Sequence, residues 1–561
     1  AGSADFRSSS GGAISAAKMA NVDREKFLHV QAGDEDKFDV FVEWIAANGG
    51  HFPKLHLKEY AEGNRGVHAT DVIEDSELVM SIPYRCVFTV EMGKATSTGQ
   101  RVLKSNIEGR FDAPKHIYLM LFLLIDAENE DSFFQPYYRI LPQFLGGMPI
   151  FWSQEEYTYL RGSHLLNQCQ MRKDAIRADY EEICEVDPSF SRFPLDRFAW
   201  ARMIVCSRNF GGNIRGLRSS AMVPMADMLN HYRPRETRWG FDEQKEVFTI
   251  HSCCTIGAGD SVYDSYGKKC QHRFLLNYGF SIEDNREPDG KNPNQIHMTF
   301  DLLPESEDPA RAIKQMLLDQ VLHISDTLRG IRVSTVYTDK TTKEAFSYLR
   351  FLHMTDREIM PFFVRCQSGD WDITRELTLP VSLENEEKVL RHFGRVCMAQ
   401  LKQYDTSWDE DKARLASEDG PQPFTNERNA LIYMAGEKEI CHFYIDLMME
   451  GVRYIRMLKK RNVNDARKLQ GMLREKYAEH DQIHDYSGSC EYVTHAIVHL
   501  LKTTFGVRDG PPPQRSSGKG SGGAGGGRGR GGEPRQVAED GGVDGDNIKK
   551  SKKKKKKRGK S

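Results

Sequence analysis

Three polar residues follow an apolar stretch of the sequence, with no glycine or proline between them. The stretch MVPMADMLNHY, residues 222–232, has the composition of a buried strand, yet it ends in Asp227, Asn230 and His231. Buried polar groups need hydrogen-bond partners, so this end holds either an internal turn with a satisfied histidine or a contact to a ligand. A metal ion is not indicated, because no third ligand lies at a suitable spacing.

Two further segments depart from a simple strand pattern. AEGNRGVHAT, residues 61–70, contains Glu62, Gly63 and Arg65, and its glycines permit either a tight turn or close approach of a ligand to the backbone. It lacks the pattern of a phosphate-binding loop. In VCSRNFGG, Arg208 follows a core segment, where an arginine usually pairs with a carboxylate of the protein or of a ligand.

Aromatic residues gather in a fourth segment, VYDSYGKKCQHRFLLNYGF, residues 262–280. Among its glycines stand Tyr263, Tyr266, Tyr278 and Phe280. Because a buried tyrosine hydroxyl needs a partner, this density predicts an aromatic cavity with polar groups in its wall. Any one of the four segments, taken alone, is more often structural than functional.

The elements that position these segments differ between the two parts of the chain. Short runs bounded by Gly, Pro or Asp predict strands at 77–83, 246–250 and 261–265. A helix-rich stretch lies between about 100 and 205. Its apolar run at 117–125 is too short to span a membrane and predicts a core helix. We therefore expect a β-rich unit, residues 36–300, with a helical insertion.

Between 301 and 505 the apolar residues recur at helical spacing. One predicted helix begins at Asp308 with Pro309 in its first turn, and another begins at Ser382 with an acidic first turn. This region predicts an all-α domain. Together with the β-rich unit before it, the expected fold class is α+β.

The two ends of the sequence differ in composition from the rest. Residues 506–561 carry 16 basic and 6 acidic residues, whereas the preceding 505 residues carry 62 basic and 74 acidic ones. This Gly- and Lys-rich end predicts a disordered basic tail, either merely solvated or serving nuclear localisation or nucleic-acid binding. Residues 1–35 are predicted to be a disordered leader, compatible with a transit-peptide remnant.

Composition bounds the remaining function classes. The 561 residues are 39% hydrophobic and 28% charged, which suits two or more globular domains. The 11 cysteines include no CxxC pair, so neither a disulfide framework nor a structural zinc site is indicated. We expect a monomer that does not enter a membrane. Its expected location is the cytoplasm, the nucleus or both, or a plastid if the leader is a transit-peptide remnant.

Taken in order, the motifs resemble those of a known family. EGNRG, SRNF, PMADMLNH and YxxYG followed by NYGF resemble the SET-domain methyltransferases, in the branch typified by the Rubisco large-subunit lysine methyltransferase. The resemblance covers about residues 40–450. It implies a split SET domain with a pseudoknot and a helical insertion, followed by a helical substrate-binding domain. EGNRG has one residue more than the family's usual E-G-x-G.

The resemblance also implies roles for individual residues. It implies S-adenosyl-L-methionine as the cofactor, contacted by Glu62, Gly63, Arg65, Arg208, Asn230, His231, Tyr278 and Phe280. The implied catalytic residue is Tyr266, which would orient the acceptor amine and the sulfonium. The implied substrate side consists of Arg208, Phe210, Ala226, Asp227 and Tyr263. No metal is implied.

Methyl transfer requires a lone pair on the acceptor nitrogen. A lysine is protonated at neutral pH, and removing the proton costs about 4–5 kcal/mol because its pKa is about 10.4. A sulfonium about 4 Å away raises the energy of the ammonium by a comparable amount, on the order of 4 kcal/mol at an effective dielectric constant of about 20. An enzyme of this kind therefore mainly aligns the reacting atoms and needs no strong general base.

Two positions bear on which residue is methylated. One relative in the superfamily methylates a histidine of actin, and its branch has Trp directly before the Asp of the motif and Asn two residues after the Arg. This sequence has Ala226 and Phe210 there, an apolar pair that favours an alkyl chain. We therefore expect a protein-lysine N-methyltransferase acting on a non-histone protein, with nucleic acid bound only through the basic tail. The alternatives are a protein-histidine N-methyltransferase of the actin-modifying type and a non-catalytic protein- or RNA-binding scaffold.

Overall fold

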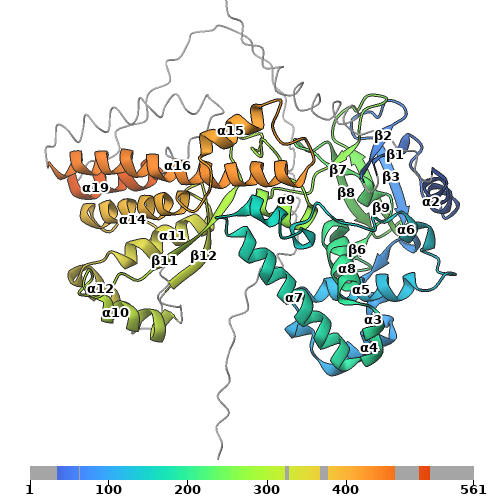
Figure 1. Ribbon diagram of the computed structural model, residues 1–561, viewed down its shortest axis with the longest axis horizontal. Helices are drawn as coiled ribbons and strands as arrows, with labels where there is room; N and C mark the ends of the chain where they lie inside the picture. The colour runs from blue at the N-terminus through green and yellow to red at the C-terminus, as the bar shows by residue number, and fades with distance from the viewer. Residues whose placement is uncertain (1–34, 62–63, 323–326, 367–376, 461–491, 506–561) are drawn as a thin grey trace, which may run out of the picture.

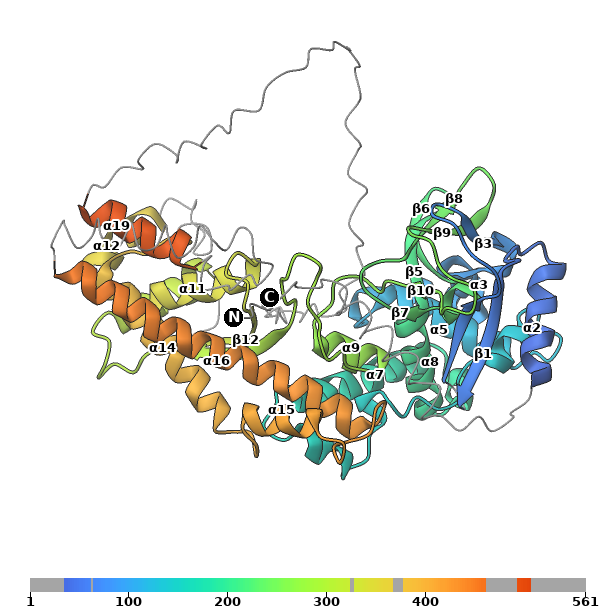
Figure 2. The ribbon, with the colours of Figure 1, turned by 90° about the horizontal axis from the view of Figure 1, so that it is seen from above.

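The computed structural model describes residues 35–61, 64–322, 327–366, 377–460 and 492–505 (Figure 1). It has two parts: a sheet-containing part built from the N-terminal half of the chain, and a mainly helical part built from the C-terminal half. Seen from above, the long helix α16 (Asn426–Lys459) runs from the far end of the helical part to the junction with the other part (Figure 2). The predicted leader and basic tail lie outside the described residues, apart from residue 35.

Small sheets form the framework of the N-terminal part. Two are three-stranded, with the orders β3–β9–β8 and β4–β6–β5, and the pairs β1–β2 and β10–β7 complete the set. The strands are β1 (Leu55–Ala61), β2 (Asn64–Ala69), β3 (Leu78–Pro83), β4 (Phe88–Thr89), β5 (Asn209–Ile214), β6 (Leu217–Met222), β7 (Asn230–His231), β8 (Thr237–Asp242), β9 (Val247–Ser252) and β10 (Tyr263–Asp264). The strands predicted at 77–83, 246–250 and 261–265 are thus present, the last as only two residues.

A helical insertion separates β4 from β5, as predicted. Its helices are α3 (Val90–Ala95), α4 (Ser97–Ser105), α5 (Pro114–Ala127), α6 (Gln135–Ile140), α7 (Leu165–Val186) and α8 (Leu195–Arg208), with 3-10 turns η2 (Glu108–Arg110), η3 (Pro149–Phe151), η4 (Glu156–Leu160) and η5 (Pro188–Arg192). Helix α2 (Glu35–Ala47) and the turns η1 (Tyr84–Cys86) and η6 (Ala226–Met228) complete this part, before α9 (Gln271–Tyr278). The apolar run at 117–125 lies inside α5 and is almost entirely buried, so it is a core helix.

The C-terminal part is helical except for one pair of strands. Its helices are α10 (Arg311–Met316), α11 (Lys340–Leu352), α12 (Asp356–Cys366), α14 (Leu383–Leu401), α15 (Trp408–Ala416), α16 and α19 (Val498–Phe505), with π-helical turns η7 (Leu317–Leu322) and η8 (Val493–Ile497). Strands β11 (Gln295–Asp301) and β12 (Thr327–Ser334) pair in antiparallel fashion. The expected α+β class is confirmed, but this part is not all-α. The alternating burial of Ile296, Met298 and Phe300 explains the difference, because it has the period of a strand.

Buried ion pairs join the helices of the C-terminal part. Arg350 on α11 makes a bidentate pair with Glu386 on α14, at 2.8 and 2.7 Å, and both side chains are fully buried. Lys438 on α16 bonds Asp411 on α15 at 2.5 Å. Such pairs fix the relative position of the helices, since removing one partner leaves an uncompensated buried charge. Ser382 caps α14 as predicted, accepting from the N–H of Asn385.

The two parts contact each other along one side of α16. The side chain of Asn429 accepts from the backbone N–H of Ser281 at 2.9 Å, and that of Ser163 donates to Tyr433 at 3.4 Å. The rings of His164 and His297 stack with centroids 4.7 Å apart, joining the start of α7 to β11. Among the helices that the structure describes, none is both long and apolar enough to cross a membrane.

Candidate active site

The apolar stretch at 222–232 is not a strand that ends in polar groups. Strand β6 ends at Met222, and the chain then turns at Met225, whose φ is +74°. Asp227 lies on the 3-10 turn η6, and Asn230 and His231 form the short strand β7. Sequence reasoning missed this turn because a left-handed conformation is uncommon for a residue other than Gly, Asn or Asp.

Tyr266 lies against the segment that ends in His231. Strands β7 and β10 pair in parallel, with Asn230 opposite Tyr263 and His231 opposite Asp264. Two residues later, the backbone N–H of Tyr266 donates to Nδ1 of His231 at 3.0 Å. The Tyr266 hydroxyl donates to the carbonyl oxygen of Leu229 at 2.9 Å. The backbone and the phenol of Tyr266 are therefore both fixed on residues 229–231.

Five rings cluster around this contact. The Tyr266 ring stacks on Tyr278 at a centroid distance of 4.8 Å, and His231 stacks on Phe274 at 4.9 Å. Phe280 closes the cluster, 5.2 Å from Phe274 and 6.3 Å from both Tyr266 and His231. The faces of aromatic rings attract cations, so this cluster can stabilise a positively charged group.

His231 is neutral in this cluster. Burial lowers its pKa to about 3, and the nearby charges of Arg233 and Lys269 act in the same direction. Because Nδ1 accepts a hydrogen bond, the proton of the neutral ring resides on Nε2. That Nε2 is buried and has no hydrogen-bond partner among the described residues. The imidazole can therefore donate to a ligand without adding a charge.

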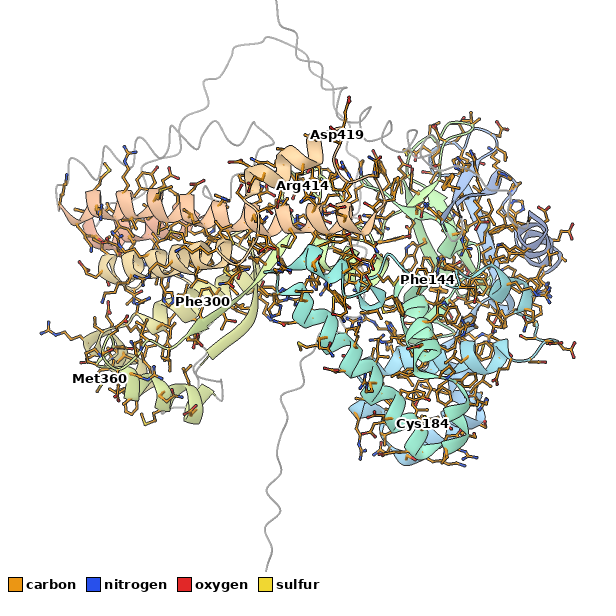
Figure 3. All side chains as sticks on the ribbon, in the orientation of Figure 1. Phe144, Cys184, Phe300, Met360, Arg414 and Asp419 are labelled. Atoms are coloured by element: carbon orange, nitrogen blue, oxygen red, sulfur yellow. The ribbon has the colours of Figure 1, made fainter. Side chains whose placement is uncertain are left out.

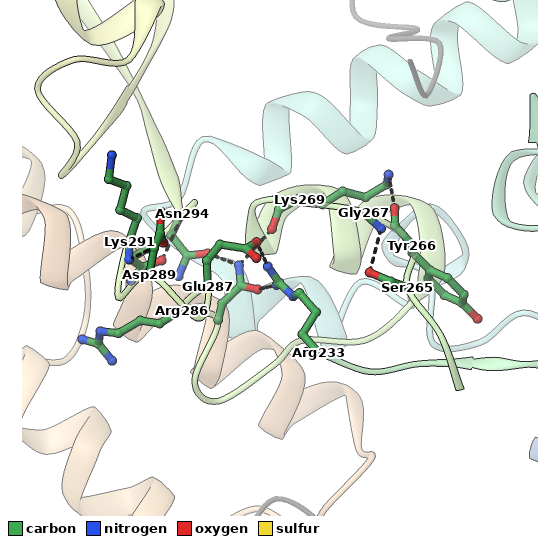
Figure 4. Close-up of polar contacts among 12 residues, drawn as sticks. Arg233, Ser265, Tyr266, Gly267, Lys269, Arg286, Glu287, Asp289, Lys291 and Asn294 are labelled. Carbon is green, nitrogen blue, oxygen red and sulfur yellow. Dashed lines mark hydrogen bonds and ion pairs between the residues drawn. The ribbon is translucent and has the colours of Figure 1, made fainter. Parts of the chain in front are cut away.

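A polar network holds the backbone that follows Tyr266 (Figure 4). The Lys269 ammonium donates to the carbonyl oxygen of Tyr266. Arg233, two residues after β7, binds Glu287 and the side chain of Asn285. Asn285 in turn donates to the carbonyl oxygen of Lys269 at 2.9 Å. This network fixes the residues after Tyr266 to the chain that leaves β7.

Two arginines, Arg65 and Arg208, lie near the carboxylate of Asp227, which precedes strand β7. Arg208, at the end of α8, donates through Nη1 to the carbonyl oxygen of Asp227 at 2.9 Å and to its Oδ2 at 3.2 Å. The hydroxyl of Tyr137 donates to the same Oδ2 at 2.8 Å. Arg65, on β2, donates to the carbonyl oxygen of Ile140. Two guanidinium groups and one carboxylate leave this buried cluster with an excess positive charge.

Several polar atoms of the arginine cluster have no partner among the described residues: Arg65 Nε and Nη2, Arg208 Nε and Asp227 Oδ1. Burial, and then the charge of Arg208, lowers the pKa of Arg65 to about 10. Burial also raises the pKa of Asp227, although Arg208 and Arg65 oppose the shift. Unsatisfied buried donors with excess positive charge are suited to bind an anion such as a carboxylate.

Asn230 links the aromatic cluster to the arginine cluster. Its side-chain nitrogen donates to the carbonyl oxygen of Arg65 at 2.8 Å. Gly66 permits this approach, because a Cβ there would lie 2.5 Å from the hydroxyl of Tyr60 and 3.3 Å from the Asn230 nitrogen. Gly66, the second glycine of the EGNRG motif, is therefore required by close packing.

The remaining predicted site residues lie as follows. Tyr263 is tilted against Tyr232, with ring centroids 5.2 Å apart. Phe210, on β5, packs against Trp239 and Phe248, and Ala226 is buried on η6. Glu62 and Gly63 lie outside the described residues. The structure thus brings Asn230, His231, Tyr266, Tyr278 and Phe280 together, with Arg65, Arg208 and Asp227 beside them.

Two contributors were not predicted from the sequence. Tyr137 lies in the helical insertion, where nothing distinguishes it from the aromatic residues around it. Phe274 stands four residues before Tyr278 on α9, and this spacing on one helix face was the available signal. Within the described parts of the chain, no group of three His, Cys, Asp or Glu residues is arranged to hold a metal ion.

Comparison with known proteins agrees with this architecture. Residues 305–440 match the family model for Rubisco LSMT substrate-binding. The SET domain of LSMT bound to lysine and AdoHcy aligns with a TM-score of 0.61 at 21% identity, over 75% of this chain and 93% of that one. Rubisco LSMT bound to AdoMet aligns with a TM-score of 0.59 at 23% identity, with the same coverage.

Curated relatives come from several vertebrates. The actin-histidine N-methyltransferases of Papio anubis and Homo sapiens are each 26% identical over 427 residues, which is 72% of this chain and 67% of theirs. That of Gallus gallus is 25% identical over the same length.

The fold is similar to that of the SET domain of LSMT, with a helical insertion, and residues 305–440 are similar to the Rubisco LSMT substrate-binding family. These similarities agree with the resemblance found in the motifs of the sequence.

Proposed function

We propose that this protein is an S-adenosyl-L-methionine-dependent protein N-methyltransferase. The observation that carries the proposal is the contact between Tyr266 and the 229–231 segment, inside an aromatic cluster and beside the two buried arginines. The structural neighbours bound to AdoMet and AdoHcy support the cofactor, and the relatives that methylate actin support a protein substrate.

The described residues fit such a cofactor at its carboxylate and at its sulfonium. The unpartnered donors of Arg65 and Arg208 suit its carboxylate, and the ring faces of Tyr266, Tyr278 and Phe280 suit its sulfonium. When bound, the cofactor supplies a methyl group on a positively charged sulfur, which a nitrogen lone pair displaces. His231 stays neutral at physiological pH and so does not repel that charge.

Tyr266 aligns the reaction. Its hydroxyl donates to Leu229, so its oxygen lone pairs can accept a hydrogen bond from an N–H group of the acceptor, either of a lysine amine or of the non-reacting ring nitrogen of an imidazole. The 229–231 segment holds the ring from two sides, so little conformational entropy remains to be lost when the acceptor binds. No general base is required for a neutral imidazole. For a lysine, the positive surroundings favour loss of its proton.

The acceptor is either a histidine or a lysine. Histidine is the stronger candidate, because the curated relatives methylate a histidine of actin and match 72% of this chain. Lysine is supported by two positions: Phe210 stands where the histidine-methylating branch has Asn, and Ala226 stands where it has Trp. Phe210 packs in an apolar aromatic group and offers an imidazole no hydrogen bond.

One assay tests activity and acceptor together. The purified chain is incubated with methyl-labelled cofactor and monomeric actin, and in parallel with a whole cell extract, and tandem mass spectrometry identifies the methylated residue. Labelled histidine or labelled lysine supports the enzyme and decides between the acceptors. Absence of label in every protein, in both incubations, would overturn the proposal.

The non-catalytic scaffold remains the competing function, carried by the basic end of the sequence. It requires salt-sensitive binding to nucleic acid that disappears when residues 506–561 are removed, with no methyl transfer by either form. A methyltransferase keeps its labelling activity after that truncation.

A further inference from the structure

An exposed phenylalanine stands on the loop that contacts the aromatic cluster. Phe144 is 77% exposed and lies in the segment that connects α6 to η3 (Figure 3). Three residues further on, Gly147 touches Gly279: a Cβ on Gly279 would lie 2.8 Å from the Gly147 carbonyl carbon. Gly279 lies between Tyr278 and Phe280, whose rings contact Tyr266. Phe144 therefore stands on a loop whose backbone packs against the turn between two rings of the aromatic cluster.

The loop that carries Phe144 is held at several points. The indole of Trp200 donates to the carbonyl oxygen of Pro142 at 2.9 Å, and that of Trp152 donates to Gly147 at 3.2 Å. Asn426, in the first turn of α16, donates to the carbonyl oxygen of Gly146 at 2.9 Å. The Phe144 ring lies over Gly146, where an added Cβ would come within 2.3 Å of it. The ring is thus exposed, on a loop whose backbone is fixed in position.

Two more exposed aromatic residues lie on segments that Asn426 connects to this loop. Asn426 also donates to the Glu156 carboxylate at 2.6 Å, on the turn η4 that carries Tyr159. Phe424, two residues before Asn426, has a left-handed φ of +66° and is 46% exposed, and Tyr159 is 36% exposed. A left-handed φ is costly for an aromatic residue, and such strain is concentrated at binding sites. Three exposed rings thus lie on three segments joined by one amide.

We propose that Phe144, on a segment joined through Asn426 to those of Phe424 and Tyr159, binds an apolar side chain of the protein substrate, within a few residues of the methylated one. This inference rests on the proposed function. The loop packs against the turn between Tyr278 and Phe280, so we expect a chain that presents its acceptor to Tyr266 to lie within reach of Phe144. Phe424 and Asn426 also belong to the stretch that matches the substrate-binding family model.

Phe144 suits an apolar side chain of the substrate because its loop is already held in place and needs little further ordering on binding. Aromatic side chains that are exposed yet rigid make strong contact residues, since they lose little conformational freedom on binding. Two neighbouring carboxylates are already paired, because Glu156 bonds Asn426 and Glu427 pairs with Arg414 at 2.8 Å. An apolar contact with the exposed Phe144 ring is therefore favoured over a charge pair with either of them.

Two oriented peptide libraries test the inference, one with a central histidine and one with a central lysine, each varied at the flanking positions. Methyl incorporation and retention on peptide beads are measured for the wild type, Phe144→Ala and Gly146→Ala. Gly146→Ala keeps the phenylalanine but displaces its ring. Val364→Ala, which trims a 66% exposed side chain on α12, is the matched control. Cofactor affinity is measured separately for each variant by calorimetry.

The wild type is expected to select an apolar residue at one flanking position. Phe144→Ala should reduce that selection about tenfold, the loss of one good contact residue, with cofactor affinity unchanged. Gly146→Ala should weaken it, and Val364→Ala should not. Methylation with the same apolar selection in Phe144→Ala would overturn the inference and leave the proposed function standing. Retention that depends on Phe144, without methylation, would support the docking surface and count against the enzyme. Neither retention nor methylation of any peptide by the wild type would overturn both.

Discussion

The backbone N–H of Tyr266 donates to Nδ1 of His231 at 3.0 Å, and the two rings stack with their centroids 5.1 Å apart. These residues are 35 positions apart in the chain, and the parallel pairing of β7 with β10 brings them together. The contact places the proton of the neutral imidazole on Nε2 and fixes the backbone of Tyr266, while the carbonyl oxygen of Leu229 accepts from its phenol. His231 thus helps to hold Tyr266 in position.

Replacing Tyr266 by phenylalanine should abolish most of the methyl transfer. The substitution keeps the ring stacking and the bond from the backbone to His231, and removes only the hydroxyl that bonds Leu229. We expect kcat to fall on the order of a hundredfold or more, because the oriented hydrogen bond between the Tyr266 oxygen and an N–H group of the acceptor is lost. Cofactor affinity should stay close to that of the wild type, as measured by calorimetry.

Tyr180→Phe is the matched control for this substitution. The Tyr180 hydroxyl also donates to a backbone carbonyl oxygen, that of Phe193 at 2.7 Å, but it lies on α7, among the rings of Phe190 and Phe198. Its loss should leave kcat unchanged. An active Tyr266→Phe enzyme, or an equal loss in the two variants, would contradict the role given to Tyr266.

The Asp227 carboxylate should stabilise the fold through the two arginines around it. Asp227→Asn keeps the shape but leaves Arg208 and Arg65 without their counter-charge in a buried place. We expect the free energy of unfolding in urea to fall by about 3 kcal/mol, as when one partner of a buried ion pair is removed. Asp405→Asn breaks the pair with Arg161, in which both side chains are 62% exposed, and should cost less than about 1 kcal/mol. Equal effects of the two substitutions would show that burial does not strengthen the Asp227 cluster.

The sequence predicted the candidate site residues better than it predicted the tertiary contacts around them. Asn230, His231, Tyr266, Tyr278 and Phe280 stand in short local motifs, and the family resemblance of these motifs marked them as candidate site residues. Tyr137 reaches Asp227 from the helical insertion, 90 positions away, and only tertiary packing reveals that contact. The pair of Arg65 with Arg208 arises in the same way, since β2 and the end of α8 meet only in the folded chain.

Local patterns failed where backbone geometry departed from residue preference. The turn at Met225 uses a positive φ without a glycine, so the stretch before Asp227 had the pattern of a strand. The pair β11–β12 lies across the predicted domain boundary at 300, and its second strand is separated from the first by helical turns. Helical periodicity on both sides concealed the alternating residues of β11.

Acid should destabilise the junction between the two parts of the protein. His272 is buried there, with Nδ1 3.1 Å from the sulfur of Cys270 and its ring 5.2 Å from that of His297. Burial, and then neighbouring positive charge, lowers the pKa of His272 to about 3, against about 6.5 in an unfolded chain. Below about pH 6.5 the unfolded chain therefore binds a proton that the folded chain does not. The free energy of unfolding should fall as pH falls, by up to about 1.4 kcal/mol per pH unit for this histidine.

The variant His272→Asn should reduce that pH dependence. Between pH 6.5 and 4.5, the free energy of unfolding in urea should fall less steeply with pH than in the wild type. The difference in slope should correspond to about one proton bound on unfolding. His56→Asn replaces an exposed histidine on β1 and serves as the control. A slope that is the same in all three proteins would mean that His272 does not contribute to the acid sensitivity.

The close contact between Gly279 and Gly147 should be essential for the aromatic cluster. Gly279 ends α9 with a φ of +80°, and an added Cβ would lie 2.8 Å from the Gly147 carbonyl carbon. Gly259 has nearly the same φ, +84°, but a Cβ there would meet nothing within 4 Å. Both Gly→Ala variants lose about 1 kcal/mol of stability, because alanine disfavours a positive φ. Only Gly279→Ala also forces two backbone segments apart.

We expect Gly279→Ala to be less stable than Gly259→Ala by about 1–3 kcal/mol, the usual effect of overpacking a closely packed contact. It should also lower kcat, because moving Gly279 displaces the rings of Tyr278 and Phe280 from Tyr266. Thermal unfolding and the labelling assay measure the two effects on the same protein samples. If Gly279→Ala loses stability but keeps full activity, the position of these rings does not control the reaction. If the two variants are equally stable, the 141–148 loop yields without strain and does not hold Phe144 in place.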